Sequence, residues 1–181
     1  MHTIEEMGPH QLLDEKRALE EAIARLELSM TRAANWIISQ FAPNGPIMRE
    51  PRLSLCHKST WGLFEDGRLE EANRLLDWID ANAKLGVGRY GFARETPFEN
   101  EQQLLYRLLT FGKVAEDLRH PAFANDETRQ EILTYQHPCG GVVGYKEDPA
   151  YVQTLNPLFT GFFGIWALKA GLVEPAVKAA E

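Results

Sequence analysis

Residues 137–170 read HPCGGVVGYKEDPAYVQTLNPLFTGFFGIWALKA, which is a turn, a polar loop and an apolar segment in succession. The turn is predicted because Pro138 disfavours helix at the residue before it, and Gly140 and Gly141 can adopt a positive φ. Residues 156–170 are apolar on nearly every face, as in helices that are buried on all sides. They are too short and too rich in glycine for a membrane span. The stretch therefore predicts a core helix of a helical domain.

Amphipathic helical patterns cover most of the remaining chain, with apolar residues at three-to-four spacing and charged residues opposite. These patterns occupy residues 9–41, 68–83, 101–118, 126–135 and 173–181. Residues 67–72 and 171–176 resemble each other, and both follow a short apolar segment. Such self-similarity is typical of arrays of helical hairpins. We therefore predict one all-α domain over residues 1–181, in which residues 1–20 extend the first helix.

Composition is that of an ordinary soluble globular protein, with 44% apolar and 25% charged residues. A net charge of −7 argues against nucleic-acid binding, which needs a clustered basic face. The N-terminus lacks the apolar core of a secretory signal, and no segment predicts a membrane span. Cys56 and Cys139 are therefore expected to be reduced in the cytoplasm. Their spacing does not suit a zinc site, and we expect neither a metal nor a cofactor.

Three elements of the sequence resemble the α/α toroid superfamily of terpenoid cyclases, protein prenyltransferases and six-hairpin carbohydrate enzymes. They are Gly67-Arg68-x-Glu70-Glu71-Ala72, the Gly140-Gly141 pair, and Tyr151-Val152-Gln153 before the apolar helix. Residues 141–153 also look like part of linalool dehydratase/isomerase, a toroid member. That enzyme has cysteines where this chain has Gly144 and Thr154. The Asp-x-Asp-Asp run associated with class II cyclases does not occur in the sequence.

The resemblance implies inner helices that line a central cavity and loops that form its mouth. A complete ring usually has six hairpins, and this sequence supplies about three, so we expect about half a ring. The chain is then either a fragment of a longer protein or closes its ring against another chain. Half a ring would leave the apolar helix at 156–170 partly exposed, and large exposed apolar patches mark interfaces. We therefore expect a homo-oligomer or a complementing chain.

Asp148, Tyr151 and His57 are the candidate catalytic residues. A carboxylate beside apolar walls can have a raised pKa and act as a general acid or base, and histidine can carry a proton near neutral pH. The alternative for Asp148 is that Asp148-Pro149 forms a turn that caps the following helix. The alternative for His57 is a hydrogen-bonded polar residue near the mouth of the ring.

The candidate substrate-binding residues are mostly aromatic side chains that would form the walls of the cavity. They are Trp61, Tyr90, Phe92, Glu95, Tyr145, Gln153 and Trp166. Aromatic faces can stabilise a carbocation or stack on a sugar ring. Glu95 could also pair with Asp148 in two-carboxylate chemistry. The alternative for the aromatic residues is an ordinary place in the core.

The sequence thus predicts a cofactor-independent α/α-toroid enzyme, or a fragment of one. Its chemistry would be acid/base catalysis of the lyase, isomerase, cyclase or hydrolase type. The substrate would be a small isoprenoid-like or carbohydrate-like molecule in the central cavity. The alternative is a non-catalytic helical-repeat scaffold that binds a protein partner through its concave face, as solenoid proteins do.

Overall fold

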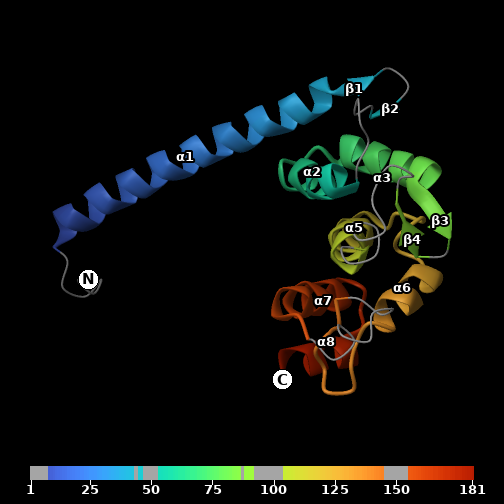
Figure 1. The fold of residues 1–181 in the computed structure, drawn as a ribbon. Coiled ribbons are helices and arrows are strands. Elements are labelled where there is room, and N and C mark those ends of the chain that lie inside the picture. Colours follow the sequence, from blue (N-terminus) through green and yellow to red (C-terminus); the bar gives the residue numbers. More distant parts are fainter. Residues whose placement is uncertain (1–7, 43–44, 47–52, 87, 92–103, 145–154) are drawn as a thin grey trace.

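The computed structural model describes residues 8–42, 45–46, 53–86, 88–91, 104–144 and 155–181, and this part is almost entirely helical (Figure 1). The predicted all-α class is confirmed. The helices are α1 (Pro9–Ser39), α2 (Leu53–Glu65), α3 (Leu69–Ala83), α5 (Leu104–Leu118), α6 (Asp126–Leu133), α7 (Pro157–Lys169) and α8 (Val173–Ala180). Two small antiparallel pairs connect them, β1 (Phe41–Ala42) with β2 (Gly45–Pro46) and β3 (Lys84–Gly86) with β4 (Arg89–Tyr90).

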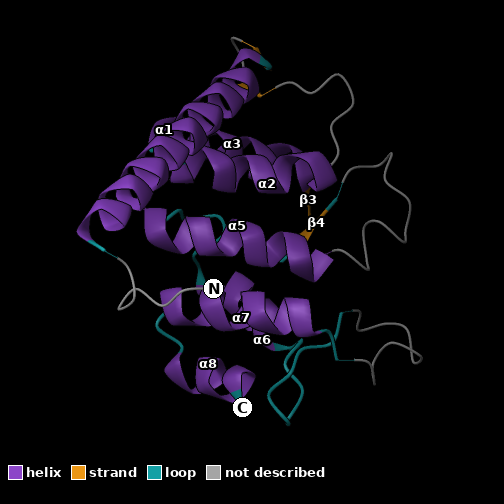
Figure 2. Cartoon of the chain, turned by 90° about the vertical axis from the view of Figure 1, so that its left-hand side faces the viewer, coloured by secondary structure: helices purple, strands orange, loops and turns teal. Residues whose placement is uncertain are grey.

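The helices α2, α5 and α7 stack on one another in one layer, with α5 in the middle (Figures 1 and 2). Each is followed along the chain by a second helix: α3 packs beside α2, α6 contacts α5, and α8 packs against α7. The described residues therefore form a stack of helix pairs, as the repeated sequence segments indicate. Closure into a toroid stays a prediction.

The two similar segments at residues 67–72 and 171–176 form the same turn. Gly67 and Gly171 have φ values of 78° and 74°, in the left-handed region that favours glycine. The amide of Arg68 donates to the carbonyl of Leu63, and the amide of Leu172 donates to the carbonyl of Ala167. This is the Schellman arrangement, which satisfies the last carbonyls of a helix and redirects the chain. The turn explains why α2–α3 and α7–α8 are tight hairpins.

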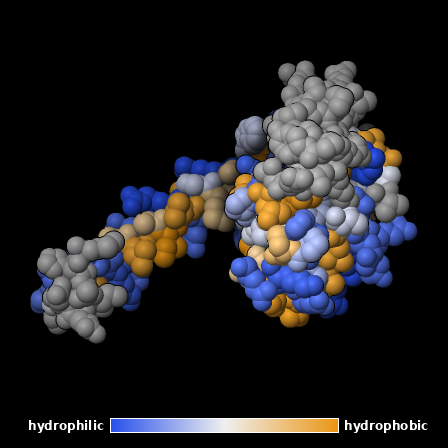
Figure 3. All heavy atoms as spheres, turned by 60° about the horizontal axis from the view of Figure 1, so that its bottom comes forward, coloured by the Kyte–Doolittle hydropathy of each residue, from blue (hydrophilic) through white to orange (hydrophobic). Residues whose placement is uncertain are grey.

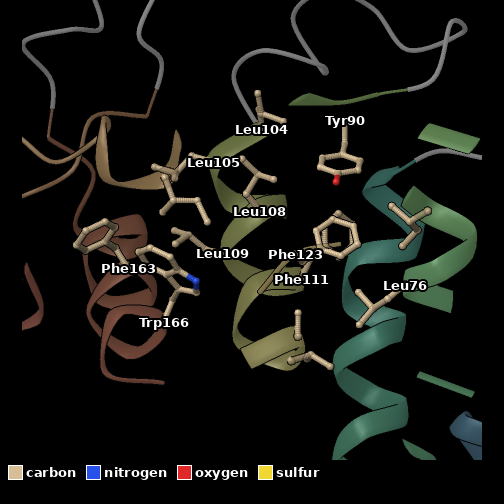
Figure 4. Packing of buried hydrophobic residues seen from close by; sticks show 14 of the residues in the cluster. Leu76, Tyr90, Leu104, Leu105, Leu108, Leu109, Phe111, Phe123, Phe163 and Trp166 are labelled. Atoms are coloured by element: carbon tan, nitrogen blue, oxygen red, sulfur yellow. The ribbon is translucent and has the colours of Figure 1, made fainter. Parts of the chain in front are cut away.

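The core is centred on α5, whose residues 104–115 are buried except Tyr106. Figure 4 shows Phe163 and Trp166 of α7 on one side of α5, and Tyr90 and Phe123 on the other. The burial on all sides that the composition of residues 156–170 predicts is not found, because α7 buries one face and exposes the opposite one; the prediction that this helix is partly exposed is the correct one. Three of its apolar side chains, Leu158, Ile165 and Leu168, are 58%, 49% and 62% exposed. The helix buried nearly all round is α5.

Helix α1 is continuous over 31 residues and projects from the helical stack (Figure 1). Only its C-terminal part is attached to the stack. Ala34 is buried there, the Thr31 hydroxyl donates to Asp66, and the side-chain oxygen of Asn35 accepts from Arg68. Residues 10–30 are exposed apart from the partly buried Ala22.

Candidate functional site

Five aromatic side chains from three stacked helices meet on one face of the stack. They are His57 and Trp61 of α2, Tyr106 of α5, and Phe159 and Phe162 of α7, and we call them the aromatic cluster. The Tyr106 ring lies 5.2 Å from His57, 5.5 Å from Phe159 and 5.4 Å from Phe162, measured between ring centroids. Trp61 meets Phe162 edge-on at 6.1 Å. These distances and angles are those of favourable aromatic pairs.

Helical spacing explains how each helix contributes to this face. His57 and Trp61 are four residues apart on α2, and Phe159 and Phe162 are three apart on α7, so each pair shares a helix face. On α5, Tyr106 is seven residues, or about two turns, before a lysine, Lys113. Lys113 therefore lies on the same side of α5 as the aromatic cluster.

Lys113 is a charged residue in a buried position, with 6% of its surface exposed. Its Nζ lies 2.9 Å from the centroid of the Trp61 ring and 5.5 Å from that of Phe162, a cation–π arrangement. Burial lowers the pKa of Lys113 to about 8, although the negative charge of Glu65 opposes the shift. Glu65 also accepts a 2.6 Å hydrogen bond from Trp61 Nε1. An amine with this pKa is partly neutral near pH 8 and can act as a base.

The structure brings His57 and Trp61 together in the aromatic cluster, and places two other predicted residues within the core. Tyr90 is 2% exposed, contacts Phe123 and donates to Asp80 at 2.9 Å. Burial is the main cause that raises the pKa of its phenol, and the hydrogen bond to Asp80 adds to it. Trp166 is fully buried beside Phe163. The other predicted site residues lie outside the described residues: Phe92, Glu95, Tyr145, Asp148, Tyr151 and Gln153.

Sequence reasoning did not single out Lys113, Tyr106, Phe159 or Phe162. A signal for Lys113 was available, because it is a lone lysine in an otherwise apolar segment, LLTFGKVA. The seven-residue spacing from Tyr106 was a second signal. No signal in the sequence shows that Tyr106 of α5 and Phe159 and Phe162 of α7 lie beside the face of α2 that carries His57 and Trp61.

A second feature is an open depression of about 480 Å³ on α6. It is lined by Asp126, Glu127, Gln130, Glu131 and Thr134, and it shares no residue with the aromatic cluster. Three of its five lining residues are acidic, and it is open to solvent, so it is not the enclosed cavity that the sequence predicts. Among the described residues, no group of three or more His, Cys, Asp and Glu side chains is placed to hold a metal ion.

The lowered pKa of Lys113 predicts a pH dependence of stability. Between pH 8 and 10.5 the unfolded chain binds more protons at this amine than the folded chain, so the free energy of unfolding should rise with pH. The full shift corresponds to about 3 kcal/mol, and partial solvent access reduces the expected rise to about 1–3 kcal/mol. Urea unfolding at pH 7, 8, 9 and 10 would measure it.

Matched variants isolate this contribution from other groups that titrate in the same range. The rise should be absent from Lys113→Met, which has no amine, and from Lys113→Arg, whose guanidinium stays charged throughout. The difference between the wild-type profile and each variant profile gives the part of the rise in unfolding free energy that is due to Lys113. Parallel profiles for all three proteins would contradict the prediction.

Within the described ranges, no helix is long and apolar enough to cross a membrane. Comparisons of the chain with protein-family models, with curated proteins and with solved structures give no match.

Proposed function

We propose that this chain binds a small isoprenoid-like or carbohydrate-like molecule against the aromatic cluster. The proposed activity is acid/base conversion of the lyase, isomerase, cyclase or hydrolase type. One observation carries the proposal: two buried titratable side chains, His57 and Lys113, lie among aromatic rings that three helices contribute. Their burial limits competition from water, and the lowered pKa of Lys113, about 8, suits proton transfer slightly above neutral pH.

The aromatic cluster supplies the binding element of this proposal. Trp61, Tyr106, Phe159 and Phe162 are partly exposed, so their rings are accessible to a ligand. Aromatic faces can stack on the apolar face of a sugar or stabilise positive charge that develops on an isoprenoid chain. The amine of Lys113 already uses one ring face in this way. A cationic intermediate would therefore compete with Lys113, whereas a neutral Lys113 could accept a proton from the ligand.

The predicted catalytic segment is connected to this face at both ends. Gly144, the last described residue before the 145–154 segment, lies beside Phe159, because a Cβ built on Gly144 would be 3.4 Å from that ring. Val143 and Leu155 form an antiparallel bridge, which brings the two ends of the segment together. These anchors support the proposal that Asp148 and Tyr151 act as proton carriers next to the aromatic cluster.

The substitution Asp148→Asn tests the proposed chemistry, because it removes a proton carrier at nearly constant size. The wild-type protein would be incubated in D₂O with a panel of ten-carbon isoprenoid alcohols and of monosaccharides. Mass spectrometry would follow conversion and deuterium uptake. We expect Asp148→Asn to lower turnover at least about 100-fold, as loss of a general acid or base does. Far-UV circular dichroism should show unchanged helix content.

Asp126→Asn is the matched control, since the Asp126 side chain is 95% exposed on α6. Its turnover should equal that of the wild type. Turnover that Asp148→Asn leaves unchanged would remove Asp148 from the mechanism. If neither substrate class is converted or takes up deuterium, the enzymatic proposal itself fails.

A second candidate function is a non-catalytic scaffold that binds a protein partner. The observation that favours it is the continuity of the aromatic cluster across three stacked helices, with rings that are only partly buried. Helical arrays bind protein segments over such faces. The same panel separates the two candidates: a scaffold converts none of the compounds.

A further inference from the structure

The projecting helix α1 carries a long apolar stripe that has no partner among the described residues. Leu12, Leu19, Ile23, Leu26 and Met30 share one face of α1, with Lys16 between the first two, and from Leu19 on they recur at the three- and four-residue spacing of a helix–helix seam. These five side chains are 41%, 61%, 45%, 65% and 44% exposed. Figure 3 shows apolar side chains along one side of the projecting arm. We call these five residues the α1 stripe.

The α1 stripe lies on a helix that contacts the stack only near its C-terminal end. Residues 9–30 span about 33 Å of helix at 1.5 Å per residue. In proteins most of the stability of an amphipathic helix comes from the packing of its apolar face. An exposed stripe of this size normally marks an interaction site. We therefore expect another apolar surface to pack along the α1 stripe.

The last inner helix of the stack, α7, offers such a surface. Leu158, Gly161, Ile165 and Leu168 follow one another along the face opposite Phe163 and Trp166, which pack toward α5. Helix α8 packs against α7 on the side away from α5 and continues the stack (Figures 1 and 2). Leu158, Ile165 and Leu168 are exposed, so they lie outside the contacts of α7 with α5 and α8. We call this apolar face the outer face of α7, and another helix can pack on it.

We propose that the α1 stripe of one copy of this chain packs against the outer face of α7 in a second copy, head to tail. The lengths are compatible, because α7 has 13 residues, or about 20 Å of helix, against about 33 Å in the free part of α1. A Cβ built on Gly161 would meet nothing within 4 Å, so another helix can approach closely there.

Charge favours this pairing over pairing of two α1 helices. Glu15, Glu20 and Glu27 flank the α1 stripe, at positions that face the partner helix in a coiled coil. Two parallel α1 helices would bring Glu15 toward the partner's Glu20, and antiparallel ones would bring Glu20 toward the partner's Glu27. By contrast, α7 has no acidic residue, and its one charged side chain, Lys169, forms an ion pair with Asp117 of α5. The α7 face therefore repels the acidic flanks of α1 less than a second α1 would.

A contact of this kind is heterologous, because it joins two different surfaces of the same chain. Each copy therefore donates one α1 and accepts another, so that copies form a closed ring or an open chain. The inference concerns assembly and does not depend on the proposed function.

Light scattering on a sizing column, at protein concentrations up to about 100 μM, tests the proposal. We expect the wild-type protein to be larger than a monomer. Leu26→Glu places a charge in the α1 stripe, and Ile165→Glu places one in the outer face of α7. Each variant alone should be a monomer with unchanged helix content by circular dichroism. Leu28→Glu is the matched control, since Leu28 is 50% exposed on the opposite side of α1 and should keep the wild-type mass.

Mixing the two variants distinguishes this interface from any other. The Ile165→Glu copy retains an intact α1, and the Leu26→Glu copy retains an intact α7, so an equimolar mixture should form a one-to-one complex. A wild-type monomer would overturn the proposal. So would an Ile165→Glu protein that self-associates, because α1 would then pair with α1, or a mixture that stays monomeric. A Leu26→Glu protein that keeps the wild-type mass would also overturn it.

Discussion

Replacing Trp166 with alanine is expected to lower the free energy of unfolding by about 3–5 kcal/mol, the range for truncating a buried tryptophan. Trp166 is fully buried, contacts Phe163 and lies against Gly112 of α5. The substitution removes the largest side chain between α5 and α7 and leaves a cavity that the two helices can close only in part. Urea unfolding followed by circular dichroism would measure the loss.

Trp36→Ala is the matched control, because Trp36 is 63% exposed on α1. Its effect should stay within about 0.5 kcal/mol, as for most surface substitutions. A second pair of variants tests the same contact from the other side. A Cβ added at Gly112 would be 2.8 Å from the Trp166 indole, whereas one at Gly62 of α2 would meet nothing within 4 Å. Gly112→Ala should therefore be destabilising and Gly62→Ala should not; equal effects would contradict this packing.

Local features of the fold could be predicted from the sequence because each depends on a few neighbouring residues. Gly67 and Gly171 end α2 and α7 with the same turn, and the similarity between residues 67–72 and 171–176 indicates that turn. The burial of a whole helix depends on what packs around it. For α7 the composition predicts burial on all sides, yet helices cover only part of it. For α5 the pattern predicts an amphipathic helix, yet Arg107, Thr110 and Lys113 are all buried.

The candidate site could be predicted only where its residues lie on one helix, because their spacing then decides whether they share a face. His57 was predicted as a proton carrier and Trp61 as a wall of the cavity, and their four-residue spacing gives them a common face. Tyr90 and Trp166 were expected to line the same cavity, yet Tyr90 contacts Phe123 and Trp166 contacts Phe163. Which face of one helix meets the next depends on rotation about each helix axis. A single sequence contains no signal for that rotation, which explains why Tyr106 and Lys113 were missed.

Replacing Arg129 with methionine is the other substitution for which we expect a large loss, about 3–5 kcal/mol. Arg129 of α6 binds both carboxylate oxygens of Glu116 on α5, from Nε at 2.8 Å and from Nη2 at 2.6 Å. The Glu116 side chain is only 4% exposed. Without the guanidinium, a negative charge would stay buried with its main partner removed, which costs more than the pair contributes. Thermal and urea unfolding of the variant would measure the loss.

The double variant Arg129→Met/Glu116→Met separates the cost of the buried charge from the value of the ion pair. Two apolar side chains in contact can replace a buried pair at little cost, so the double variant should recover most of the stability lost in Arg129→Met. Arg129 also reaches Asp126 at 3.3 Å, but that carboxylate is 95% exposed, so Asp126→Ala should cause only a small fraction of the loss. If the double variant is as unstable as Arg129→Met, the loss comes from the packing of the Arg129 side chain. If it recovers, the buried carboxylate of Glu116 is what makes Arg129 necessary for holding α6 against α5.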